Sequence, residues 1–165
     1  MSDTTSITVT TVVATDPATA FEIFTAEVNA WWKRGPRFRP SVHGVGVLRF
    51  KPGVGGRPIE TYDDKSSFDF GRIKVWAPGE RLVFELIGRD FGPNESTEVE
   101  VCFEGEGENT RLTVEHRGSE RFPDDHPARH GLGEPAFSDV MSVWWADLFV
   151  SIKIQVAETL TREGT

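Results

Sequence analysis

The segment that decides the fold lies near the C-terminus, where residues 136–162 read AFSDVMSVWWADLFVSIKIQVAETLTR, without glycine or proline. Large apolar side chains recur there at intervals of three and four residues, which is the spacing of one face of a helix. The first such row is Phe137, Met141, Trp144, Leu148 and Ile152, and a neighbouring row is Trp145, Phe149 and Val156. A helix of about 25 residues is roughly 37 Å long, at about 1.5 Å per residue, and could lie along a whole sheet.

The residues from about 44 to 117 follow a different period, because apolar and polar side chains alternate one by one. Residues 97–104 read TEVEVCFE, with Val99, Val101 and Phe103 on one face and the glutamates and Cys102 on the other. This alternation is typical of antiparallel strands with one covered and one wet face. An earlier strand is predicted over residues 7–13. The pair Asp16-Pro17 then predicts the start of a helix that ends near Trp32. The sequence therefore indicates an α+β fold.

Composition narrows the class of protein. The chain has 165 residues, with 18 lysines and arginines against 26 aspartates and glutamates, a net charge of −8. This balance disfavours nucleic acid and anionic membranes as partners, and no apolar run predicts a membrane span. Aromatic residues make up 11% of the chain, which argues against disorder. We expect one cytoplasmic domain over residues 6–163.

Five phrases, in order, carry a resemblance to a known family. They are the strand, "Asp-Pro-Ala" helix start and paired tryptophans of 13–32, FKPGVGGRPIE at 50–60, GRIKVWAPGERLVF at 71–84, TEVEVCF at 97–103 and TRLTVEHRG at 110–118. This pattern resembles the START-like or SRPBCC superfamily. Within it, the chain is most similar to the bacterial activator-of-heat-shock-protein-90-ATPase-like family. The resemblance implies a helix-grip fold: a curved antiparallel sheet of about seven strands wrapped around a long C-terminal helix, with two short helices after the first strand.

A curved sheet that grips a helix is expected to leave a cavity between the two. Because this fold hosts several functions and no catalytic motif stands out, we predict binding of a small hydrophobic molecule there, without a cofactor. An enzyme of the cyclase or hydrolase type and a protein-interaction module are the alternatives. The side chains predicted to line the cavity are Trp32, Phe50, Glu60, Arg72, Trp76, Phe84, His116, Met141, Trp144 and Trp145.

Three of these residues are polar and carry the enzyme alternative. His116 shares its face of the last strand with Leu112 and Val114, so it is either a ligand or acid–base group or a core histidine. The pattern leaves the faces of Glu60 and Arg72 open. If Glu60, Arg72 and His116 converge, they could orient a small carboxylate or carbonyl compound.

Other candidate sites are weaker. The glycine-rich stretch 52–56 lies between predicted strands and has no Lys-Ser/Thr ending, so a hairpin or bulge is favoured over a phosphate site. Asp124, Asp125, His126 and His130 lie among prolines and glycines, which favours a polar loop over a metal site. A homodimer remains open, and we do not expect a chaperone partner, because only about half a dozen residues precede the first strand.

Overall fold

The computed structural model describes residues 6–32, 47–62, 64–69, 71–87, 96–118 and 134–163. The elements, in chain order, are β1 (Ser6–Val13), α1 (Pro17–Ala26), α2 (Val28–Trp31), β2 (Val47–Phe50), β3 (Pro58–Thr61), β4 (Ser67–Asp69), β5 (Gly71–Ala77), β6 (Arg81–Leu86), β7 (Thr97–Glu106), β8 (Asn109–Arg117) and α3 (Glu134–Glu163). The strand, the two short helices and the long terminal helix stand in the predicted order, which confirms the α+β class.

The strands form two antiparallel sheets. The larger has the order β1-β8-β7-β6-β5, and the smaller has the order β2-β3-β4. The predicted curved antiparallel sheet with its long C-terminal helix is confirmed, and the strand count differs slightly, because the described strands divide into sheets of five and three where one sheet of about seven was expected. The two sheets meet at the turn between β2 and β3, where the Gly55 N–H donates to the Ile73 carbonyl at 2.9 Å and the Ile73 N–H donates to the Gly56 carbonyl at 2.8 Å. A turn, and not a strand, thus extends the edge of β5.

The glycines of this turn are required by the backbone. Gly53 and Gly55 have φ angles of +92° and +85°, a region that side chains disfavour. A Cβ atom on Gly56 would lie 2.1 Å from the Lys51 carbonyl oxygen. The glycine-rich stretch is therefore a tight turn that lets the two sheets approach, as the hairpin interpretation predicted.

Helix α1 begins where the sequence predicted. Asp16 is the N-cap, and its carboxylate accepts hydrogen bonds from the Thr19 N–H at 3.2 Å and from the Thr19 hydroxyl at 2.6 Å. Pro17 occupies the first turn, where no N–H is needed. This double hydrogen bond holds the pKa of Asp16 below its usual value.

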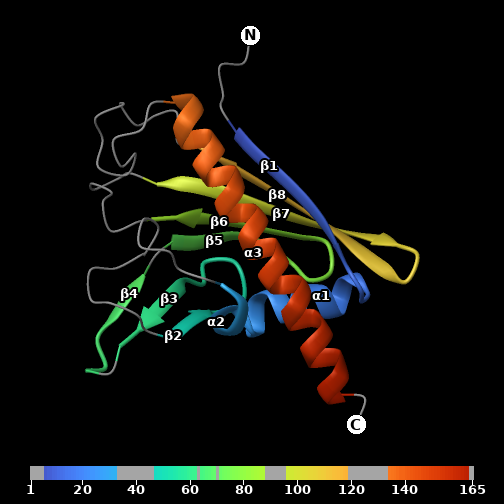
Figure 1. Ribbon diagram of the computed structural model, residues 1–165. Helices are drawn as coiled ribbons and strands as arrows, with labels where there is room; N and C mark the ends of the chain where they lie inside the picture. The colour runs from blue at the N-terminus through green and yellow to red at the C-terminus, as the bar shows by residue number, and fades with distance from the viewer. Residues whose placement is uncertain are drawn as a thin grey trace.

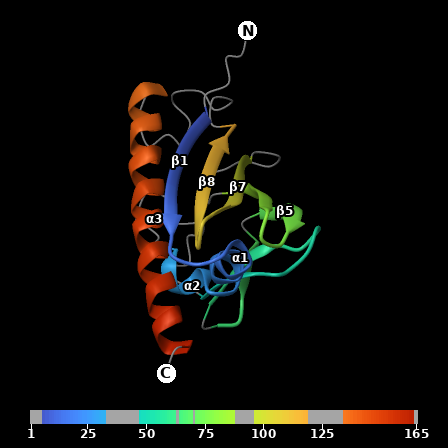
Figure 2. The same cartoon turned by 90° about the vertical axis from the view of Figure 1, so that its right-hand side faces the viewer.

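Helix α3 lies diagonally across the inner face of the larger sheet, with β1 alongside it (Figures 1 and 2). It has 30 residues, and its buried side joins the core through Trp145, Leu148, Phe149, Ile152 and Val156. The helix is long and apolar enough to cross a bilayer by length and composition, with 44% of the relevant window buried. A core helix of a soluble domain passes the same test, so this is weak evidence for a membrane span.

A β-bulge in β5 overturns one prediction. The register between β5 and β6 shifts between Ile73 and Val75. Arg72 before the shift and Lys74 at the shift are exposed, whereas Trp76 after it turns inward and packs on Phe21 of α1, with ring centroids 5.1 Å apart. Both Arg72 and Trp76 were predicted to line the cavity, which requires them to share a face. The extra residue of the bulge places them on opposite faces, so the prediction for Arg72 is wrong.

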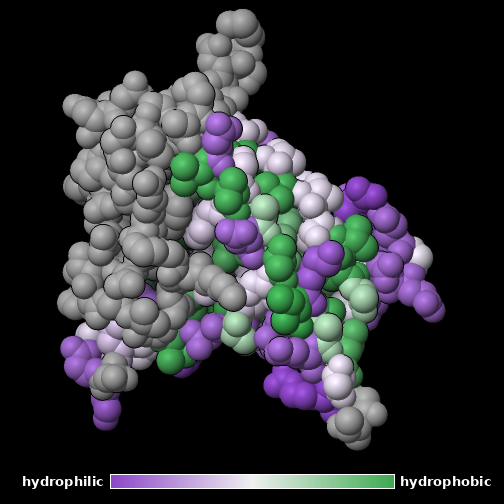
Figure 3. All heavy atoms as spheres, viewed as in Figure 1, coloured by the Kyte–Doolittle hydropathy of each residue, from purple (hydrophilic) through white to green (hydrophobic). Residues whose placement is uncertain are grey.

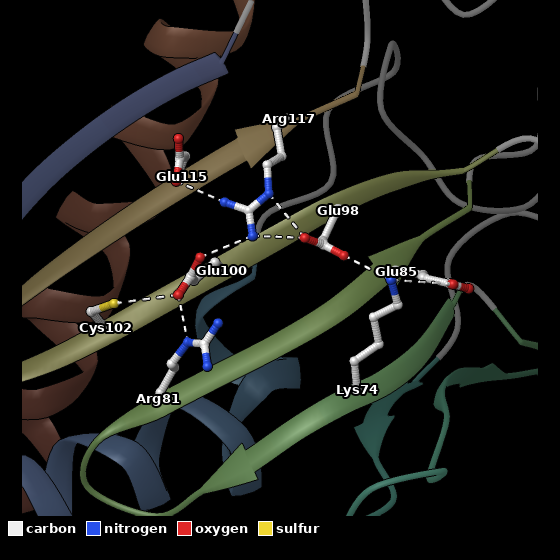
Figure 4. A network of polar contacts seen from close by, with 8 residues as sticks. All are labelled: Lys74, Arg81, Glu85, Glu98, Glu100, Cys102, Glu115 and Arg117. Atoms are coloured by element: carbon white, nitrogen blue, oxygen red, sulfur yellow. Dashed lines mark hydrogen bonds and ion pairs between the residues drawn. The ribbon is translucent and has the colours of Figure 1, made fainter. Parts of the chain in front are cut away.

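The outer face of the larger sheet carries a network of charges (Figure 4). Arg117 lies at its centre and makes ion pairs with Glu98 at 2.6 Å, Glu100 at 2.9 Å and Glu115 at 2.7 Å. Lys74 adds a 2.8 Å bond to Glu98, and this bond is the main cause of the lowered pKa of that carboxyl. The network confirms that this face is the wet one.

Candidate functional site

Five of the predicted cavity residues form one aromatic cluster on the inner side of the fold. Phe50 of β2 packs on Phe84 of β6, with ring centroids 5.3 Å apart, and Phe84 lies 6.5 Å from Trp32. Trp32 in turn meets two tryptophans of α3, Trp144 at 5.9 Å and Trp145 at 5.5 Å. The cluster joins residues more than a hundred positions apart, and its rings meet edge to face or tilted, as packed aromatics prefer.

His116 lies at the end of this cluster and is buried. The indole N–H of Trp145 donates to Nδ1 of His116 at 3.0 Å, and Nε2 lies 2.7 Å from the hydroxyl oxygen of Thr97. Since Nδ1 accepts a hydrogen bond, the ring proton sits on Nε2 and is donated to Thr97. The Thr97 hydroxyl in turn lies 3.4 Å from the Leu86 carbonyl, which completes a chain from α3 through β8 and β7 to β6.

This geometry makes His116 a neutral core histidine. Both ring nitrogens are used by the protein, and burial lowers its pKa from 6.5 to about 4. A general base must instead reach a substrate proton and titrate near the working pH. Of the two interpretations of His116, the structure favours the core one, and its ring helps to hold Trp145 in place.

Glu60 is the second polar group of the inner side. It is 0% exposed, and its Oε1 accepts a hydrogen bond of 2.8 Å from the Tyr62 hydroxyl. In the register of β2, β3 and β4, Glu60 stands opposite Leu48 and Phe68. Directly opposed residues of antiparallel strands share a face, and Leu48 belongs to the core that Phe68 packs against. Glu60 therefore faces the apolar interior.

The other predicted residues lie elsewhere. Met141 is buried with Ile7 in a small cluster that Trp144 also touches, whereas Trp76 packs beside α1. Arg72 is exposed on the wet face, so the prediction that it lines the cavity is wrong, and the open possibility that Glu60, Arg72 and His116 converge is not realised. The four residues of the weak metal candidate, Asp124, Asp125, His126 and His130, lie outside the described residues. Among the residues that are described, no three His, Cys, Asp or Glu side chains are placed to hold a metal.

Sequence reasoning missed two partners of the buried polar groups. Thr97 has the same parity along β7 as Val99 and Val101, and this could have placed it inside. Tyr62 stands two positions after Glu60, so the same alternation could have placed it on the face of Glu60. Cys102 was placed correctly on the glutamate face, where burial raises the pKa of its thiol and disfavours a nucleophilic role.

The arrangement of one long helix, a gripping sheet and an aromatic interior matches a known family. The model of the family described as Activator of Hsp90 ATPase homolog 1-like protein matches residues 14–149. The chain belongs to this family. No curated protein sequence matches it significantly.

Solved structures with the same fold have diverse descriptions. A Mesorhizobium loti protein, MLL2253, aligns with 16% identity and a TM-score of 0.64 over 94% of this chain and 98% of its own. An HSP90 activator from Plasmodium falciparum has 17% identity and a TM-score of 0.62, covering 92% and 96%. CalC, a self-sacrificing resistance protein from Micromonospora echinospora, has 24% identity and a TM-score of 0.62, covering 93% and 95%. At these identities the likeness shows a shared fold alone, and the site must supply the function.

Proposed function

We propose that this protein binds, in the cytoplasm, a small hydrophobic molecule that carries a hydrogen-bond donor such as a hydroxyl or an amine. The ligand would lie between the sheets and the N-terminal half of α3, against the aromatic cluster. The observation that supports this proposal most is Glu60, a fully buried carboxylate on a face otherwise made of core residues.

The chemistry of Glu60 selects the class of ligand. A carboxylate inside an apolar region is costly unless hydrogen-bond donors surround it, and it is a strong acceptor for any donor that enters. The Tyr62 hydroxyl already donates to Oε1, and a ligand hydroxyl or amine would be a further donor to the same carboxylate. An anionic ligand would be repelled at the same place.

The aromatic cluster supplies affinity, and Glu60 supplies orientation. Apolar contact contributes about 25 cal/mol per Å² removed from water, and a hydrogen bond to a charged group about 1.5–3 kcal/mol. Trp144 is only partly buried, although it touches both Trp32 and Trp145. Its indole is therefore the first contact we assign to a ligand. Catalysis is not part of this proposal, because His116 is fully engaged by Trp145 and Thr97.

A matched set of ligands tests the proposal. Naphthalene, a naphthol, a naphthylamine and a naphthoic acid share one ring system and differ only in the polar group. Quenching of tryptophan fluorescence and titration calorimetry would measure each dissociation constant. We expect the naphthol and the amine to bind more tightly than the hydrocarbon and the acid.

Two variants assign the site. Glu60→Gln should weaken the naphthol and amine by roughly 10- to 100-fold and leave naphthalene nearly unchanged. Arg72→Gln, on the exposed outer face, is the matched control and should bind like the parent protein. The proposal fails if none of the four compounds binds, or if Glu60→Gln leaves their order of affinity unchanged.

A further inference from the structure

The two sheets are joined by a narrow contact. Among the described residues, the main-chain hydrogen bonds between them are those of Ile73 with Gly55 and Gly56, at 2.9 and 2.8 Å. Beside these bonds, β3 begins with Pro58, which has no N–H to donate. A Cβ atom on Gly71 of β5 would lie 3.2 Å from Cγ of Pro58, so the two strands approach closely here. The described strands of the two sheets thus meet without a ladder between them.

A contact of this kind is suited to a hinge. Main-chain ladders keep each sheet rigid, whereas glycine allows large changes of φ and ψ. β4 ends at Asp69 and β5 begins at Gly71, so the chain also passes between the sheets beside a glycine. At the far end of the smaller sheet, residues 64–67 are exposed, and hydrophilic side chains project there, at the lower left of the molecule (Figure 3). Movement of that end therefore uncovers little apolar surface.

The proposed ligand contacts are divided between the two sides of this hinge. Phe50 and Glu60 belong to the smaller sheet, whereas Phe84 belongs to the larger sheet and Trp144 to α3. The rings of Phe50 and Phe84 meet with centroids 5.3 Å apart, and the two residues are 6% and 0% exposed. Because packed rings leave no room between them, a molecule that reaches both Glu60 and Phe84 must first separate these rings.

A side chain of α2 ties the edge of the smaller sheet to the rest of the fold. β2 is the edge strand, and the N–H of its residue Leu48 donates to Oδ1 of Asn29 at 2.9 Å. Asn29 lies in α2 and is exposed, so its substitution leaves the core intact. This bond resists movement of β2 away from α2, and we call it the latch.

We infer that the smaller sheet is a hinged flap, which turns about the contact of Gly55 and Gly56 with Ile73 and is held closed by the latch. Opening of the flap parts Phe50 from Phe84 and admits a ligand. Closing returns the smaller sheet, with Glu60, to the ligand. This inference rests on the proposed function, because it describes how a small molecule reaches Glu60.

Hydrogen exchange of the backbone amides, followed by NMR, tests the flap without any ligand. The exchange of each amide reports the free energy of the opening that exposes it to water. We expect the amides of β2 and β3 to open together, at a lower free energy than those of β7 and β8. Exchange of all four strands as one cooperative unit, at one free energy, would overturn the inference.

Two substitutions at one position test the latch. Asn29→Ala removes the acceptor for the Leu48 N–H and should raise the open fraction about 3- to 10-fold, the usual effect of one hydrogen bond, with faster exchange in β2 and β3 alone. Asn29→Asp keeps an acceptor and should behave like the parent. Glu22→Ala, an exposed truncation on the neighbouring α1, is the second control. Equally faster exchange in β7 and β8 of Asn29→Ala would show that Asn29 only stabilises the whole fold, and would overturn the latch.

Stopped-flow fluorescence with the naphthol relates the flap to binding. In Asn29→Ala the association and dissociation rate constants should both rise about 3- to 10-fold, because entry and exit both need the open state. The Kd should stay within about twofold, because the free and the bound protein lose the same bond. Rate constants equal to those of the parent would overturn the inference and leave the proposed function intact. If the naphthol does not bind, the proposed function fails, and hydrogen exchange decides by itself whether the flap opens.

Discussion

Mild acid should destabilise this protein through His116. In the folded chain its pKa is about 4, against 6.5 for an ordinary histidine. Between these values the unfolded chain binds more protons than the folded one, so stability falls as the pH falls. Above about pH 7 the neutral His116 ring makes its full contribution to the free energy of unfolding. Its loss amounts to about 2 kcal/mol at pH 5 and approaches about 3 kcal/mol at pH 4, from roughly 1.4 kcal/mol per pKa unit.

The physical cause is the pair of hydrogen bonds at the ring. A protonated His116 would present an N–H at Nδ1 to the Trp145 indole N–H, and two donors would face each other at 3.0 Å. Burial also leaves the charge without water. Carboxylates contribute little to the slope between pH 5 and 7, because their ordinary pKa values lie near 4.

Urea unfolding followed by tryptophan fluorescence at half-unit steps from pH 7.5 to 5 measures this slope. His116→Gln keeps one donor and one acceptor but cannot titrate, so its stability should be lower at pH 7.5 and nearly flat across the range. His130→Gln is the control and should keep most of the parental slope. Parallel pH curves for the parent and His116→Gln, or an NMR titration of His116 near 6.5, would refute the reasoning.

Three further substitutions test the fold. Asp16→Ala removes the N-cap of α1 and should lower the free energy of unfolding by about 1 kcal/mol, measured as a shifted urea midpoint. Gly71→Ala should be severely destabilising, because its Cβ would lie 1.7 Å from the Glu85 carbonyl oxygen. Gly105→Ala is the matched control: its Cβ would have a nearest contact of 3.6 Å, and its free energy of unfolding should lie within about 1 kcal/mol of that of the parent. Arg117→Met should cost about 1 kcal/mol at low salt and less in 1 M salt, roughly a tenfold rise in ionic strength, since its ion pairs are partly exposed.

The glycine-rich turn at 52–56 shows what a local sequence pattern can predict and what it cannot. The turn at 52–56 was predicted as a turn from composition alone, because glycine there signals a backbone that other residues avoid. That the same turn hydrogen-bonds to Ile73 and so joins two sheets depends on a strand that comes later in the chain. Contacts between distant segments leave no periodic signal in either segment.

The amino-acid sequence by itself determined the elements, their order and most of the inner faces, because helix and strand periods depend on neighbours a few residues apart. His116 and Trp145 were placed inside by period alone. Only the tertiary structure decided that His116 is bonded to Trp145 and Thr97, and that Glu60 is buried, since these contacts join separate elements. It also placed Arg72 and Trp76 on opposite faces, because the bulge in β5 is a property of two paired strands and does not exist in either strand alone.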